Sequence, residues 1–500
     1  MATVDRTTPT DTQEANTKKQ ESPKISVHPQ YRVYQPKWIK IDDCLQGEDQ
    51  IKAKGEDYLP KTSGQEASGS NGQKAYDAYQ TRAIYYNFPL ETSATASGMM
   101  SREKAKYELP TAMQGLEQSA NQDGDPLQLV HNDVNKNQVE YGRFGLLVDV
   151  PQVEAPDSPY LVDYHAFSIL NWGTKMRDGK IILSFVLLDE SHYELNKGLE
   201  HQWVYRYRIC ALDPDDRYFT EILEADQLDS LDPNEMRPSR EVSDGTDGQE
   251  AYNPYPNFKG NELDFVPFVF INVDNLDTDI QVSPLQDICD KSISIYRGEA
   301  DYRQTLFMQG QDTFYGMGLA EDERPDFLGA TAAIYAKNPD AEVGFASVSG
   351  DALAEQREGQ DDLKSATVEK SMALLDTSNT ESGKALGIRI GSKTSKLKKL
   401  VRTGAAGLTK ALQYVNMWMT DTRDETEDIK VMPNMDFIDN DEDSVADDLV
   451  KLMQAKNLGA PLSNESVHQW MQKKELTNKD FETEEADAQA EGPTVGGGMV

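Results

Sequence analysis

The sequence has little of what most catalytic or metal-binding sites need. Among 500 residues it holds three cysteines, Cys44, Cys210 and Cys289, which lie far apart with no Cys-x-x-Cys pair, so neither a disulfide framework nor a zinc site is expected. Six histidines are present, and none stands in a nucleophile or metal pattern. Phosphate-loop, Gly-x-Ser-x-Gly and His-Glu-x-x-His motifs are also missing. We therefore predict no enzyme, no metal site and no cofactor.

Long hydrophobic runs and positive charge are scarce as well. No run approaches the length of a membrane span and the N-terminus is polar, so neither membrane insertion nor secretion is expected, and a reducing cytoplasm fits the cysteine content. With 50 Lys and Arg against 86 Asp and Glu, the net charge is −36. That charge argues against a protein that coats nucleic acid, but it agrees with one that lets nucleic acid pass without sticking, because like charges repel.

The stretch from Ser283 to Thr420 organises the chain. Ser283 and Pro284 supply the N-cap and first residue of a helix over 284–309. A second helix is expected over 351–375. The face at the helical spacing is only partly apolar in both, so too little apolar area leaves water for a monomer core to stabilise them. Their neighbours are therefore predicted to be copies of the same chain.

Between these helices, residues 310–350 contain three short β-prone pieces, 313–317, 329–336 and 342–348. Each is too short to fold alone, so this unit is expected to add its edges to the sheet of a neighbouring copy.

A polar loop and a basic helix follow the second helix. The segment from Asp376 to Gly383 consists of small polar residues typical of a mobile loop. The residues from Lys384 to Thr420 hold no acid and keep a helical apolar stripe. Their eight basic residues are Lys384, Arg389, Lys393, Lys396, Lys398, Lys399, Arg402 and Lys410.

The flanking regions show weaker patterns. Helices are expected at 38–53, brokenly over 76–118, and at 444–456 and 463–474. A flexible connection is expected at 62–72, and the polar ends, up to about residue 27 and from 481 to 500, read as disordered. Strands are expected at 144–151, 160–172, 181–189, 202–212, 217–223, 264–273 and 428–437. Within 204–209, basic residues alternate with aliphatic or aromatic ones, as in a half-exposed strand.

This order of elements resembles the portal proteins of tailed bacteriophages. The resemblance covers roughly residues 30–470 and lies in the order and spacing of several motifs. They are Tyr141-Gly142-Arg143-Phe144-Gly145, Asp264-Phe265-Val266-Pro267-Phe268 and Ser283-Pro284-Leu285-Gln286-Asp287. It implies an α+β fold with portal architecture: a mixed α/β wing, a two-helix stem, a small α/β clip, a long kinked wing helix, a helical crown and assembly into a ring.

The domain boundaries that the resemblance implies run from end to end of the chain. They are a disordered arm at 1–30, the wing at 31–283, stem helices at 284–309 and 351–375 around the clip at 310–350, a tunnel loop at 376–388, the long wing helix at 389–422, the crown at 423–480 and a disordered acidic and Gly-rich tail at 481–500.

The resemblance also implies a function. A ring, of twelve copies in this family, occupies one capsid vertex, passes double-stranded DNA during packaging and ejection, and docks the terminase, which supplies ATP hydrolysis. The other implied partners are major capsid, scaffolding, and head-tail adaptor or tail proteins, and the implied location is the virion, after assembly in the cytoplasm of a bacterial host. No membrane is involved.

The candidate site is the channel lining. It comprises the tunnel loop and the residue after it: Asp376, Thr377, Ser378, Asn379, Thr380, Glu381, Ser382, Gly383 and Lys384. Its side chains are small and polar, which suits weak, sequence-blind contacts with a passing duplex. Lys384, Arg389 and Lys393 are candidate phosphate contacts.

The basic residues have an alternative role, because they can instead pair with acids of adjacent copies, such as those in Asp351–Asp362. Pairing is preferred for Lys396 to Arg402, whereas both interpretations stand equally for Lys384. Charge reversal at Lys384 is expected to alter packaging and leave the ring intact. Two alternatives to a portal remain: another virion ring such as a head-tail adaptor, or an acidic soluble enzyme.

Overall fold

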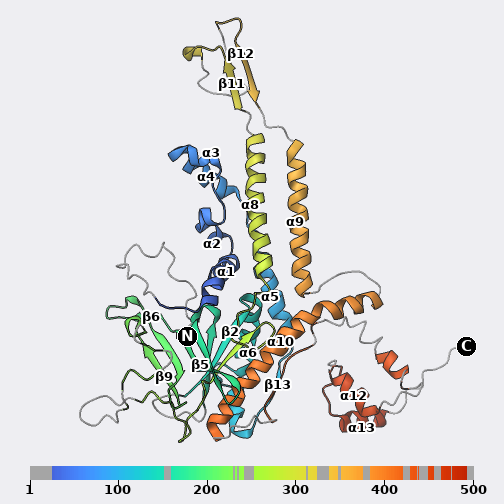
Figure 1. Ribbon diagram of the computed structural model, residues 1–500. Coiled ribbons are helices and arrows are strands. Elements are labelled where there is room, and N and C mark those ends of the chain that lie inside the picture. Colours follow the sequence, from blue (N-terminus) through green and yellow to red (C-terminus); the bar gives the residue numbers. More distant parts are fainter. Residues whose placement is uncertain are drawn as a thin grey trace, which may run out of the picture. The chain divides into compact units, whose positions relative to one another are not determined.

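The computed structural model of the protein (Figure 1) describes residues 25–150, 159–228, 231–232, 236–240, 242, 253–310, 313–323, 337–346, 351–375, 383–420, 428–435, 437, 449–454, 456, 463–473 and 476–491. Its contacts divide the chain into two units, Met1–Met435 and Asp436–Val500. Helices and small antiparallel sheets make up the described parts, so the predicted mixed α/β character is confirmed. No helix within these ranges is both long and apolar enough to cross a membrane.

Five helices open the first unit. They are α1 (Pro29–Gln46), α2 (Glu48–Ala53), α3 (Ser63–Ala67), α4 (Gly69–Arg82) and α5 (Phe88–Met100). The helix predicted from residue 38 starts earlier, because His28 caps it: His28 Nδ1 accepts a hydrogen bond from the Gln30 amide at 3.2 Å. The imidazole of His28 also stacks on Trp172, with 3.9 Å between ring centroids.

The prediction of a flexible connection at 62–72 was wrong. Thr62 and Gln65 form a capping box that starts α3, and α4 follows at once. The Gly- and Ser-rich composition of 62–72 favoured a loop, although the Thr62 and Gln65 capping pattern is present in the sequence. Gly72 has a packing role, because a Cβ there would lie 1.8 Å from the Gln65 carbonyl oxygen.

Two antiparallel sheets form the β part of this unit. In the first, β2 (Arg143–Asp149) lies between β10 (Phe268–Asn272) and β3 (Tyr160–His165), and every residue of β2 is buried. The second has the order β4 (Ile169–Arg177), β5 (Lys180–Asp189), β8 (Tyr207–Leu212) and β9 (Tyr218–Leu223). Helix α6 (Leu127–Glu140) leads into β2.

Two predicted strands are each split in the structure. The run 160–172 breaks at a 3-10 turn, Ala166–Ser168, where the chain passes from one sheet to the other and Phe167 packs edge-on against Trp38 and Tyr141. The run 202–212 divides into β7 (His201–Val204) and β8, because β7 pairs with β6 (His192–Leu195) as a separate two-stranded sheet.

Smaller elements complete this unit. They are β1 (Lys106–Glu108), which pairs with β13 (Lys430–Met432), helix α7 (Ala225–Leu228), and 3-10 turns at Gly55–Asp57, Thr111–Glu117 and Glu321–Glu323. Of the strand predicted at 428–437, only β13 forms.

The central stretch matches its prediction closely. Figure 1 shows α8 (Gln286–Gln309) and α9 (Asp351–Leu375) side by side, with β11 (Thr313–Met317) and β12 (Glu342–Ala346) paired between them in the chain. The prediction of Ser283 as N-cap and Pro284 as first helical residue was wrong, because α8 begins at Gln286 with Leu285 as its N-cap. Ser283 Oγ instead accepts from the Leu285 amide at 3.0 Å in the turn that precedes the helix. The strand predicted at 329–336 lies outside the described residues.

Helix α10 (Gly383–Thr420) starts six residues before the predicted 389, so the tunnel loop cannot extend to 388. Residues 383–388 contain no proline, and nothing stops the helix from starting at Gly383. Farther along, α10 packs closely on α6 and β10 because it has glycines there. A Cβ on Gly404 would lie 2.6 Å from Asn135 Oδ1, and one on Gly407 would lie 2.5 Å from Ile271 Cγ1.

The second unit contains α12 (Asn464–Lys473) and α13 (Phe481–Glu491), and His468 packs edge-on against Phe481 with 5.5 Å between centroids. The prediction of disorder from residue 481 was wrong as far as 491, because Asp480 caps α13 by accepting from the Thr483 amide at 2.8 Å. Residues 492–500 lie outside the described residues, as do 444–448 and 455 of the predicted helix 444–456. The rest of that prediction is confirmed, because 449–454 and 456 are helical.

Candidate functional site

The predicted channel residues are only partly within the described ranges. Residues 376–382 lie outside them, whereas Gly383 and Lys384 are the first two residues of α10. Residues 389 and 393 lie one turn apart on the same helix. The structure therefore makes the three candidate phosphate contacts members of one helix instead of a loop.

Helices α8 and α9 meet along a polar seam rather than an apolar one. The side chain of Glu299 in α8 is only 4% exposed. Its carboxylate forms ion pairs with Lys364 of α9 at 3.4 Å and with Arg303 of α8 at 2.8 Å. Lys364 also lies 4.4 Å from the centroid of the Tyr86 ring. Because a buried carboxylate needs cationic partners, this cluster fixes the position of α9 along α8.

The seam continues toward the start of α8. Lys370 of α9 contacts Asp287 at 2.5 Å, and its hydrogen bond lowers the pKa of that carboxyl group. Ser292 of α8 is fully buried, as is Thr367 of α9. Small and hydroxylated residues thus let the two helix backbones approach while leaving little apolar surface between them.

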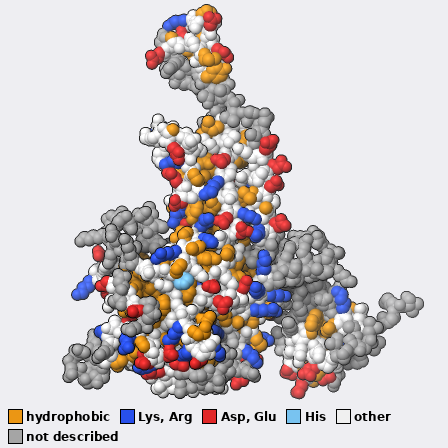
Figure 2. Space-filling model, in the orientation of Figure 1, with side chains coloured by type: hydrophobic (Ala, Val, Ile, Leu, Met, Phe, Trp, Pro, Cys, Tyr) orange, Lys and Arg blue, Asp and Glu red, His pale blue; other side chains and the backbone are white. Residues whose placement is uncertain are grey.

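The opposite face of α9 is acidic. Glu355, Glu358, Asp362 and Glu369 are exposed and recur at steps of three, four and seven, which places them along one side of the helix. The residues that face α8, such as Lys364 and Thr367, lie on the other side. Figure 2 shows acidic side chains gathered over α9.

Two clusters of apolar side chains, at the end of α8 and on the β11–β12 hairpin that follows it, are exposed to solvent. At the end of α8, Leu306 is 48% exposed, Phe307 39% and Met308 45%. On the β11–β12 hairpin, Met317 is 57% exposed and Val343 43%. A two-stranded hairpin with uncovered apolar side chains is marginal on its own.

The middle of α10 carries an exposed basic ridge, defined by Lys396, Lys399 and Arg402. Lys399 reaches Asp274 of its own chain at 2.9 Å, and both side chains are about half exposed, at 59% and 45%. Lys399 thus has an acidic partner in its own chain, outside the stretch Asp351–Asp362, and its pairing with an adjacent copy stays a prediction.

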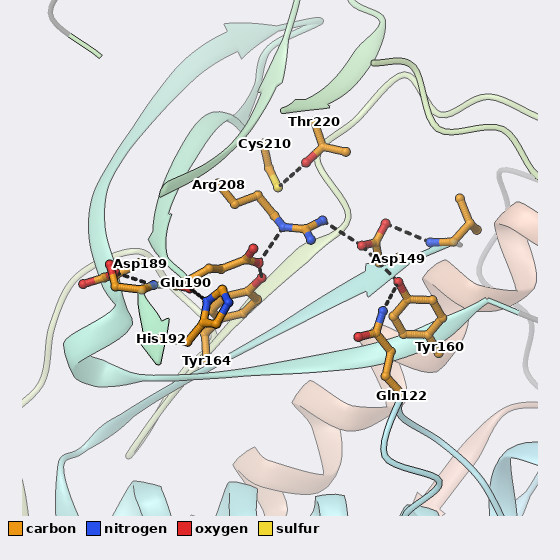
Figure 3. Close-up of polar contacts among 12 residues, drawn as sticks. Gln122, Asp149, Tyr160, Tyr164, Asp189, Glu190, His192, Arg208, Cys210 and Thr220 are labelled. Carbon is orange, nitrogen blue, oxygen red and sulfur yellow. Dashed lines mark hydrogen bonds and ion pairs between the residues drawn. The ribbon is translucent and has the colours of Figure 1, made fainter. Parts of the chain in front are cut away.

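A buried ion network joins the two main sheets (Figure 3). Arg208 of β8 donates from Nε to Glu190 at 2.6 Å and from Nη1 to Asp149 of β2 at 2.7 Å. Tyr164 of β3 donates to the same Glu190 oxygen at 2.5 Å. Burial raises the pKa of Tyr164. Burial alone would lower the pKa of Arg208, but the groups around the guanidinium, Tyr164, Asp149 and Glu190 among them, raise that pKa well above its ordinary value.

This network corrects the expectation of a half-exposed strand at 204–209. The Arg206 side chain is 43% exposed and pairs with Glu194, as expected, but that of Arg208 is only 16% exposed. Both acids that Arg208 contacts are paired, so we interpret the network as a structural link between the sheets. No local pattern in the sequence indicates this network, because Asp149 lies on β2 and Glu190 directly follows β5.

Two of the histidines, His131 and His165, lie in contacts between packed side chains. Burial lowers the pKa of His131 in α6 to about 4, and Tyr107 Oη lies 3.3 Å from its Nδ1. His165 Nδ1 lies 2.7 Å from Asn137 Oδ1. Across the described part of the chain, no three His, Cys, Asp or Glu side chains are grouped as metal ligands.

One family model matches the central stretch of the chain. Residues 284–419 match a family described as a domain of unknown function (DUF4055), a span that holds α8, β11, β12, α9 and nearly all of α10. No curated protein matches the chain. Among solved structures, the chain is similar to one in the "Neck of native GTA particle computed with C12 symmetry", with a TM-score of 0.35 and 10% identity, over 77% of this chain and 89% of that one.

Proposed function

We propose that this protein is a phage portal protein, whose copies close into a ring at one capsid vertex. Double-stranded DNA passes through the ring without sequence-specific contacts during packaging and ejection. In this proposal α8 and α9 form the stem, β11–β12 the clip, α10 the wing helix and residues 376–382 the tunnel loop. The order of these elements, described above, supports the proposal.

The proposed chain performs no chemistry of its own. A terminase docks at the clip and supplies the ATP hydrolysis that drives packaging, and head-tail adaptor or tail proteins later occupy the same vertex. Capsid and scaffolding proteins surround the ring, which has twelve copies according to the family resemblance. The finished protein is a virion component.

One observation carries the proposal: α9 contacts its own chain largely through polar side chains and buries little apolar surface there. Among its described side chains, 353–371, only Thr367 and Ser371 are buried, and both are polar. A helix gains most of its stability from the apolar area that it buries, and Leu353, Leu363 and Val368 of α9 are only half-buried. Sister copies around a central channel supply the missing neighbours.

Uncovered apolar side chains support the same proposal. Phe307 at the end of α8 and Met317 on β11 belong to the segments that adjacent copies would cover. In a closed cyclic ring, each such surface meets a different surface of the next copy, so no apolar patch stays open. A monomer would leave these side chains in water.

The ring is tested by imaging and weighing the purified full-length protein. Negative-stain images are expected to contain annular particles with a central hole, and native mass spectrometry is expected to give the mass of a closed assembly of many chains. An acidic soluble enzyme would not form annular particles. A folded protein that stays monomeric at all concentrations tested would refute the proposal.

A further inference from the structure

Two acidic residues on the outer face of α9 have no partner among the described residues. Asp362 and Glu369 are exposed on the side of the helix that points away from α8, and neither forms an ion pair within the described chain. Their neighbours Lys364 and Lys370 are already engaged by Glu299 and Asp287 of α8. The acidic face is therefore uncompensated by its own helix or by α8.

The basic ridge of α10 is similarly uncompensated. Lys396 and Arg402 are exposed, and no acid of the described chain pairs with either of them. Only the middle member, Lys399, has an intrachain partner, Asp274. Leu397, Leu400 and Val401 bury the other side of this part of α10, so the helix cannot rotate and the basic residues stay on its exposed side.

The two charged surfaces are opposite in sign and similar in spacing along the helix axis. Asp362 and Glu369 are seven residues apart, about 10 Å along α9 and nearly in line. Lys396 and Arg402 are six residues apart, about 9 Å along α10, and lie on either side of Lys399, about 120° apart around the helix. Their long, flexible side chains can reach one line of acids from both sides.

We propose that Asp362 and Glu369 of one copy form ion pairs with Lys396 and Arg402 of the adjacent copy. The pairing rests on the proposed ring and specifies one of its interfaces: the stem helix of one copy against the wing helix of the next. Because a ring interface is heterologous, an acidic surface and a basic surface on the same chain can meet all round the circle. Like-charged alternatives at the same contact would repel, so the pairs also select the register of neighbours.

A charge-swap series tests the pairing. The two double reversals, Asp362→Lys with Glu369→Lys and Lys396→Glu with Arg402→Glu, are compared with the quadruple variant that carries all four changes. Each double reversal is expected to raise the concentration for half-assembly at least about tenfold, and the quadruple variant to restore most of that loss. Glu482→Lys with Glu485→Lys, an equal charge change on exposed positions of α13, is the matched control and should assemble like the wild type.

Assembly is followed by mass photometry, with circular dichroism to establish that each variant is folded. If a lysine variant does not fold, the near-isosteric Asp362→Asn with Glu369→Gln replaces it, with a smaller but measurable loss of assembly. Double reversals that assemble like the wild type would overturn the pairing and leave the ring standing, as would a quadruple variant no better than the doubles. A wild type that forms no ring overturns the proposed function itself, and the pairing with it.

Discussion

Lys364 of α9 lies 3.4 Å from the Glu299 carboxylate of α8, whose side chain is only 4% exposed. Replacing Lys364 with Met removes one of the two cations at this buried acid and leaves Arg303 alone with it. We expect hydrogen exchange of the α9 amides to accelerate about tenfold or more, which corresponds to a loss of about 1.4 kcal/mol or more in local stability. Exchange mass spectrometry of α9 peptides measures this effect.

Arg357→Met is the control for that experiment. Arg357 faces Asp361 at 3.8 Å on the same helix, but both side chains are largely exposed, at 72% and 62%. Exposed pairs contribute roughly 0–1 kcal/mol, so exchange should change little. Equal effects from both substitutions would show that burial of Glu299 does not matter.

Arg208 is expected to be among the most sensitive positions of the β part. Arg208→Leu leaves Asp149 and Glu190 buried without their cation, at a cost of about 3–5 kcal/mol. Thermal unfolding of the variant should show a clearly lower midpoint. The neighbouring Arg206→Leu breaks an exposed pair with Glu194 and should lower stability by less than about 1 kcal/mol.

The sequence could predict the central helices because their signals are local. Ser283 and Pro284 lie three and two residues before the first residue of α8, so they locate its start closely although neither caps it. The helical spacing of its partly apolar face does not depend on what lies opposite. The Arg208 network could not be predicted, because alternation within one strand indicates two faces but does not reveal that acids from β2 and from the end of β5 converge on one of them. At 62–72, two short helices depend on one capping box, which a Gly- and Ser-rich composition outweighed.

Gly404 sets how closely α10 packs on α6. In Gly404→Ala the new methyl group would lie 2.6 Å from Asn135 Oδ1 and 2.7 Å from Gln138 Oε1, both on buried side chains. We expect a loss of about 1–3 kcal/mol in the free energy of unfolding, measured by urea denaturation. Gly359→Ala is the matched change in α9, where a Cβ has open space, and should be neutral or stabilising by up to about 1 kcal/mol.

His131 should make the protein less stable in mild acid. Its pKa is lowered to about 4 by burial, against an ordinary value of 6.5, so the unfolded chain binds the proton more readily between those values. The neutral form that the fold requires is fully available above pH 6.5, and stability falls as the pH drops toward 4. At pH 5 the loss is about 2 kcal/mol.

His131→Gln isolates this contribution. The variant should lose less stability than the wild type between pH 7 and pH 5, whatever its stability at pH 7. Urea denaturation at a series of pH values measures the slope. An unchanged slope would mean that His131 is not the group that titrates.

The native mass of the assembled protein tests the central claim most directly. If α9 and the β11–β12 hairpin depend on neighbouring copies, native mass spectrometry should give a closed assembly of many chains, and images of the same sample should show a ring with a central hole. A stable, fully folded monomer at micromolar concentration would contradict the account.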